Sequence, residues 1–172
     1  MLFRSGAIVL YNYWHKGNPL GPLLMGLCRA LLYLTAGLAV AARPGPALAA
    51  GAVVLLSYLI GLTYVAKQET LTHVANLWPL LFLAAPFVYA APSLTDNPSV
   101  AGLYALFLAW VLYALRMLVR RMSIGKAVVT LIAGISLLDA LLIAGTGAQG
   151  LAWVAAAGLL VTVFFQRYVR GT

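Results

Sequence analysis

Two polar segments interrupt an otherwise apolar sequence, and their residue types suit the binding of a phosphate group. One is the run LYNYWHKGNPL at residues 10–20, and the other is GLTYVAKQETLTH at residues 61–73. Ammonium groups and amide donors pair with phosphate oxygens, and a carboxylate can hold a bridging Mg²⁺. The side chains that could take part are Asn12, His15, Lys16, Asn18, Tyr64, Lys67, Gln68, Glu69 and His73.

Membrane anchoring is the alternative interpretation of both segments, because aromatic and basic residues commonly mark the ends of membrane helices. Zinc is not predicted, because the two histidines do not have the local spacing of zinc ligands. The single Cys28 permits no internal disulfide and no cysteine metal cluster, and we expect it to be a small buried side chain.

The elements that must position these side chains are long apolar stretches. The sequence is 64% hydrophobic and 8% charged, and long apolar runs indicate membrane spans. Each stretch approaches the roughly 17–25 residues that a helix needs to cross a hydrocarbon core of about 30 Å. The six predicted helices are Leu20–Ala42, Ala47–Ala66, Val74–Ala91, Val100–Val119, Ala127–Ala144 and Leu151–Gln166.

Basic residues fall almost entirely on alternate gaps between the stretches, and this asymmetry predicts an orientation. Arg43 alone falls on one side, and Arg29 lies inside the first stretch. Lysine and arginine in short loops are retained in the cytoplasm. We therefore predict an all-α polytopic membrane protein, a bundle of about six transmembrane helices with both termini cytoplasmic, in a bacterial plasma membrane. The residues on the basic side are Arg4, Lys16, Lys67, Arg116, Arg120, Arg121, Lys126, Arg167 and Arg170.

The net charge of +8 does not indicate a nucleic-acid partner, because the basic residues form short flanks rather than a continuous patch. Anionic membrane lipids or an anionic substrate are the expected partners.

The outer breaks, at 43–46, 91–98 and 145–150, are short and rich in proline, glycine, aspartate or asparagine, so neighbouring helices should form antiparallel hairpins. A single transmembrane domain over 1–172 is expected.

Residues 1–19 are predicted to be the tail of a preceding helix followed by a cytoplasmic loop, with an interfacial anchor as the alternative.

In the third stretch, Pro79 and Pro86 each remove a backbone hydrogen bond and favour a kink. Abundant alanine and glycine elsewhere predict close packing between helices.

Arg29 and Asp139 are charged groups predicted to lie inside the membrane, about 14 Å and 20 Å along their helices. A charge at such depth usually faces the protein interior, so one hypothesis pairs them with each other. The alternatives are a protonated or otherwise bonded Asp139, and an Arg29 that points toward a diphosphate.

Three strings resemble the UbiA-type intramembrane prenyltransferases. They are LYNYWHKGNPLGPLLMGLCRALLYL at residues 10–34, YLIGLTYVAKQE at 58–69 and FFQRYVRGT at 164–172, the last similar to an EboC-like branch. The resemblance implies an all-helical membrane enzyme that transfers a prenyl group from a prenyl diphosphate to a lipophilic or aromatic acceptor. It further implies Mg²⁺ as cofactor, Glu69 as a metal ligand, and a diphosphate site formed by Lys16, Tyr64, Lys67, Gln68, Asn12, Asn18 and Arg29.

The chain departs from this family in two ways. No run resembles the first aspartate-rich motif, and the second motif, which should follow Tyr64, retains only Glu69. One carboxylate is a poor holder for a magnesium–diphosphate complex. We therefore expect the C-terminal part of a family member, incomplete or inactive as this chain alone. The alternative is a non-catalytic membrane protein, either half of a transporter or a lipid-binding scaffold.

Overall fold

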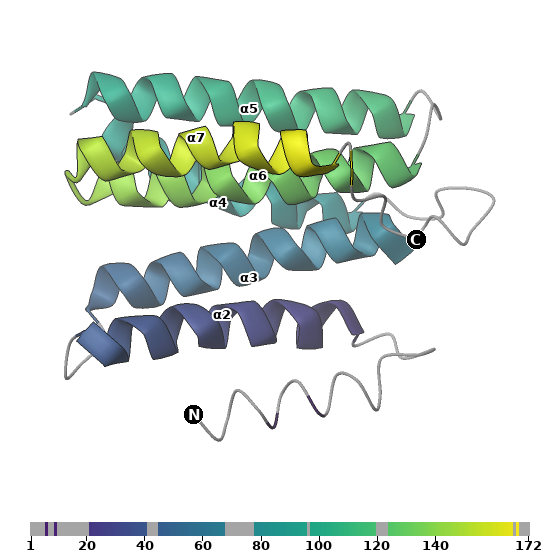
Figure 1. Cartoon of the computed structure of the whole chain (residues 1–172), viewed down its shortest axis with the longest axis horizontal. Coiled ribbons are helices and arrows are strands. Elements are labelled where there is room, and N and C mark those ends of the chain that lie inside the picture. The colour runs from purple at the N-terminus through teal and green to yellow at the C-terminus, as the bar shows by residue number, and fades with distance from the viewer. Residues whose placement is uncertain are drawn as a thin grey trace. The chain divides into compact units, whose positions relative to one another are not determined.

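The computed structural model of the chain is helical almost throughout its described residues and contains no strand there (Figure 1). The described residues are Gly6, Val9, Tyr168 and the ranges 21–40, 45–67, 78–95, 97–119 and 124–166. Within these ranges, five helices are long and apolar enough to cross a membrane, so the predicted all-α, multi-pass membrane architecture is confirmed. They are α2 (Gly21–Val40), α3 (Pro46–Lys67), α5 (Pro98–Val119), α6 (Ile124–Gly145) and α7 (Gln149–Gln166).

The helices begin and end close to the predicted positions, because local turn chemistry marks them. Pro98 opens α5, and Asn97 Oδ1 accepts a hydrogen bond from the Ser99 N–H at 3.0 Å, which is how an asparagine caps a helix. Between α6 and α7, Gly147 has φ = 87°, a left-handed conformation that glycine adopts without steric cost. The largest shift is at the start of α6, which begins at Ile124 rather than Ala127.

The third predicted stretch, Val74–Ala91, is a broken helix rather than a continuous one. It consists of η2 (Trp78–Ala84), a 3₁₀ helix, then α4 (Ala85–Ala90), then η3 (Ala91–Leu94), again 3₁₀. The second residue of each segment is a proline, Pro79, Pro86 or Pro92. A proline fits the first turn of a helix but cannot continue a preceding one. The three prolines therefore explain where this stretch is divided, and the expected irregularity is confirmed.

The chain forms two compact units, Met1–Lys67 with His73–Pro86 and Gln68–Thr72 with Phe87–Thr172. In the first unit α2 packs along α3 through glycines (Figure 1). A Cβ atom on Gly26 would lie 2.7 Å from Leu56 Cδ1, and one on Gly37 would collide with Leu48. Small residues thus allow the close approach that the sequence predicted for membrane helices.

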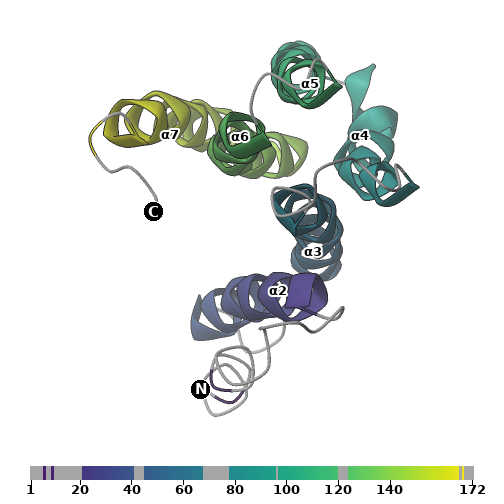
Figure 2. The ribbon, with the colours of Figure 1, turned by 90° about the vertical axis from the view of Figure 1, so that its right-hand side faces the viewer.

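In the second unit α6 is the middle helix, with α5 on one side and α7 on the other (Figure 2). Half of the membrane-spanning residues of α6 are buried, against 11% for α7. The segment after Pro86 packs on α5, where Phe87 stacks on the fully buried Phe107 with ring centroids 5.0 Å apart. The outward face of α7 is therefore left for lipid or for another protein.

The two basic residues that the structure describes in the second unit, Arg116 and Lys126, lie at one end of its helices. Gln166 Nε2, at the end of α7, donates to the Val129 carbonyl oxygen near the start of α6 at 3.2 Å. The end of α5 precedes this start, so Arg116 and Lys126 share that end. Among the described residues at the opposite end, 93–95, 97–101 and 143–152, none is lysine or arginine. Basic residues occur in alternate gaps of the sequence. Within this unit, the described ones therefore lie at one end of the helices and are absent from the described residues of the other end.

Candidate functional site

The candidate site is the end of the first unit at which α3 finishes and α2 begins. Thr63 Oγ1 lies 3.7 Å from Met25 Sδ and donates to the Leu59 carbonyl oxygen at 2.7 Å. Met25 is in the second turn of α2, and Thr63 is one turn before the end of α3. The α2–α3 hairpin is antiparallel. It therefore brings the start of α2, within the string at 10–34, beside the end of α3, within the string at 58–69.

Tyr64 and Lys67 are the two predicted site residues that the structure places at this end. Tyr64 is half-buried, whereas Lys67 is exposed as the last residue of α3. Three residues apart on a helix, they lie on neighbouring positions of its surface. A cation also interacts favourably with the negative end of the helix dipole. Chemically, the pair offers an ammonium charge and a phenol hydroxyl to an anion.

The other predicted residues of the two polar segments lie outside the described residues. The gap after α3 holds Gln68, Glu69 and His73, and the gap before α2 holds Asn12, His15, Lys16 and Asn18. Of residues 1–19 the structure describes only Gly6 and Val9, both helical and exposed, so the predicted helix tail and loop stay predictions.

Arg29 lies in α2 but not on the face that contacts α3. That face is marked by the buried Gly26 and Ala30, whereas Arg29 is exposed. Eight residues separate Arg29 from Gly21, which puts it about 12 Å along the helix. Asp139 is half-buried in α6 and belongs to the other unit, so the pairing of Arg29 with Asp139 stays a prediction. Cys28 is half-buried, less enclosed than the sequence led us to expect.

The residues at this end do not fit a magnesium site by themselves. The whole sequence has three side-chain carboxylates, Glu69, Asp96 and Asp139, and only Glu69 comes within a few residues of the end of α3 in the sequence. Asp139 is fifteen residues into α6, about 22 Å from the start of that helix. Within the described ranges, no group of three or more His, Cys, Asp or Glu side chains could hold a metal. We therefore derive no chemical step through Mg²⁺.

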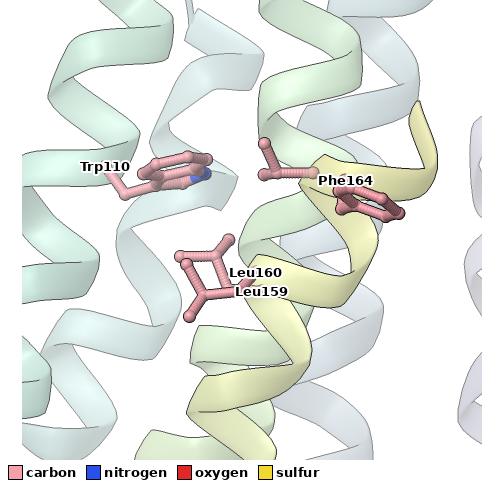
Figure 3. A pocket seen from close by; sticks show the side chains of 5 residues that line it. Trp110, Leu159, Leu160 and Phe164 are labelled. Atoms are coloured by element: carbon pink, nitrogen blue, oxygen red, sulfur yellow. The ribbon is translucent and has the colours of Figure 1, made fainter. Parts of the chain in front are cut away.

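Sequence reasoning missed a hollow of about 360 Å³ in the second unit, lined by Trp110, Leu159, Leu160, Val163 and Phe164. Figure 3 shows Trp110 of α5 on one side and the α7 side chains on the other. Trp110 Nε1 donates to the Thr130 carbonyl oxygen of α6 at 2.8 Å, which fixes the indole ring at the hollow. Nothing in the sequence signals this site, because α5 and α7 are separated by a whole helix.

The comparisons with known proteins give no family for this chain. No family model, no curated protein and no solved structure matches it.

Proposed function

We propose that this chain binds a prenyl diphosphate at the end of α3, as part of UbiA-type prenyl transfer to a lipophilic or aromatic acceptor. The observation that supports the proposal is the contact between Thr63 and Met25. It brings the end of the helix that bears YLIGLTYVAK beside the start of the helix that follows LYNYWHKGNPL. Both strings carry the family resemblance, and each contains a lysine that can bind phosphate, Lys16 in one and Lys67 in the other.

In the proposed complex, Lys67 and Tyr64 hold the diphosphate at the membrane surface. The Lys67 ammonium offsets negative charge on the diphosphate, and the Tyr64 hydroxyl donates a hydrogen bond to a phosphate oxygen. The prenyl chain lies in the apolar layer below. Transfer also needs stabilisation of the leaving diphosphate by metal, and Glu69 alone is a weak holder for it. Binding is therefore the activity that we assign to the chain by itself.

The test is equilibrium binding of geranylgeranyl diphosphate to the detergent-purified chain, with geranylgeraniol as the ligand that lacks the charge. Lys67→Gln should weaken diphosphate binding at least about tenfold, because a hydrogen bond to a charged group contributes about 1.5–3 kcal/mol. Tyr64→Phe should weaken it less. Binding of the alcohol should not change in either variant.

Matched controls lie at the basic end of the second unit, where Arg116→Gln removes an exposed charge and Tyr113→Phe removes an exposed phenol hydroxyl. They should leave diphosphate binding intact. Equal affinity for the diphosphate and the alcohol would contradict the proposal, and an unchanged affinity in Lys67→Gln would show that the site is wrongly placed.

A lipid-binding role without catalysis is the second candidate function. The hollow between α5 and α7 favours it, because its lining residues are all apolar. The binding measurement above separates the two functions. Binding that prefers the diphosphate and weakens in Lys67→Gln supports the first, whereas equal affinity for the diphosphate and the alcohol, unchanged in Lys67→Gln, supports lipid binding in the hollow.

A further inference from the structure

We infer that the hollow between α5 and α7 holds an acyl chain of an anionic phospholipid, with the lipid phosphate at Lys126. The inference is independent of the proposed diphosphate site, which belongs to the other unit. It rests on three features of the second unit: the apolar lining, the hydrogen bond that connects this lining to α6, and the exposed lysine one turn away.

The lining suits a hydrocarbon chain and offers no polar group to a soluble ligand. Trp110 comes from α5, and the other four side chains come from α7 (Figure 3). Leu160 and Phe164 are 72% and 54% exposed, so the hollow opens on the surface that these spanning helices present to the bilayer. A volume of about 360 Å³ falls at the small end of ligand sites, which run from about 300 to 1,000 Å³.

The hollow leads toward the basic end of the unit. Trp110 donates to the carbonyl oxygen of Thr130, and the Thr130 hydroxyl donates to the carbonyl oxygen of Lys126 at 2.8 Å. Thr130 and Lys126 are four residues apart and so lie on one side of α6. A helical side chain leans toward the N-terminal end of its helix, so Lys126 extends from the hollow toward the end that also carries Arg116.

The charge at this end decides which lipid is preferred. Hydrocarbon tails are as apolar as leucine side chains, so the hollow itself accepts any acyl chain. Lys126 is exposed, and a lysine can lay its methylene stem along apolar surface while the ammonium reaches the head-group region. An ammonium there attracts a lipid with a net negative charge more than a zwitterionic one. Phosphatidylglycerol is therefore the occupant to test against phosphatidylcholine.

The experiment uses the full chain in vesicles and the fluorescence of one tryptophan. Trp110 is retained alone by changing Trp14, Trp78 and Trp153 to phenylalanine. A matched variant retains only Trp153, which is 52% exposed on α7 but does not line the hollow. A minor fraction of brominated phosphatidylglycerol or brominated phosphatidylcholine is added to unlabelled phosphatidylcholine. Taking the ratio of quenching by the two lipids removes the effect of tryptophan depth.

At Trp110 the ratio should correspond to about a fivefold preference for the anionic lipid, the usual effect of one basic residue near a membrane surface. Lys126→Gln should remove the preference, and Lys126→Arg should keep it. Trp153 should show a smaller preference that Lys126→Gln leaves unchanged. Leu160→Phe, which adds bulk to the lining, should reduce quenching of Trp110 by both lipids.

Three results would overturn the inference. One is equal quenching of Trp110 by the two lipids, which would make the hollow unselective. Another is a preference at Trp110 that persists in Lys126→Gln. The third is a Trp110 that neither lipid quenches, which would mean that protein, such as a second copy of the chain, covers the hollow.

Discussion

Ser57 Oγ donates a hydrogen bond of 3.1 Å to the main-chain oxygen of Phe82, which lies four residues before Pro86. In a continuous α-helix that oxygen would accept from the N–H of residue 86, but proline has none. Phe82 lies in the 3₁₀ helix η2, whose bonds run to the residue three positions on and do not use residue 86, so the side chain from α3 supplies an additional donor to this oxygen. The additional bond matters in a membrane, where water does not compete for the carbonyl group.

Ser57→Ala should therefore lower the free energy of unfolding by about 1 kcal/mol, as expected for one lost hydrogen bond between membrane helices. The measurement is reversible unfolding in mixed micelles. Ser136→Ala is the control, because it changes a half-buried serine of the second unit, and it should cost less.

The role of Pro86 can be isolated by a double-mutant cycle. In a Pro86→Ala background, residue 86 has an N–H that can donate to Phe82, so Ser57→Ala should cost less than in the parent. Equal costs in the two backgrounds would show that the bond from Ser57 does not depend on Pro86.

Gly61 is a second position at which packing fixes the residue type. A Cβ atom there would lie 2.9 Å from Leu83 Cγ and 3.2 Å from the Leu83 backbone nitrogen. Because backbone cannot yield as a flexible side chain can, Gly61→Ala should destabilise the chain by about 1–3 kcal/mol. Gly102→Ala is the matched control in α5, where nothing lies within 4 Å of the added carbon, and it should not destabilise.

Arg29 is exposed on α2, and a charge at mid-span costs about 2.5 kcal/mol or more unless it is paired. If Arg29 and Asp139 pair, Arg29→Asp and Asp139→Arg should each reduce the yield of folded protein in membranes. The double swap should then restore the yield. A double variant no better than the single ones would exclude the pair and favour another partner for Arg29.

The predicted orientation rests on the distribution of basic residues and can be tested by cysteine labelling in intact cells. In a Cys28→Ala background, Lys67→Cys and Lys126→Cys should react with an impermeant maleimide only after the cells are opened. Thr146→Cys, in the turn between α6 and α7, should react from outside. Labelling of position 67 in unopened cells would reverse the predicted topology.

The sequence by itself determined the class of protein, the positions of the membrane helices and the separation of charge between their ends. Apolar length, flanking lysine and arginine, and turn residues such as Asn97 and Gly147 act locally, so they can be read along the chain. The candidate site was predictable to the extent that the two polar segments flank one hairpin. Tyr64 and Lys67 lie at the α3 end of that hairpin, and their part in binding stays a prediction.

Only the tertiary structure decided which side chains meet across helices. The bonds from Ser57 to Phe82 and from Trp110 to Thr130, and the hollow beside α7, join residues at least twenty positions apart. The helices are apolar on nearly all sides, so the pattern of hydrophobic residues does not mark the face that packs. In lipid, the complementary shapes of the helices and the hydrogen bonds between them determine which face packs. Neither can be predicted from the sequence of a single helix.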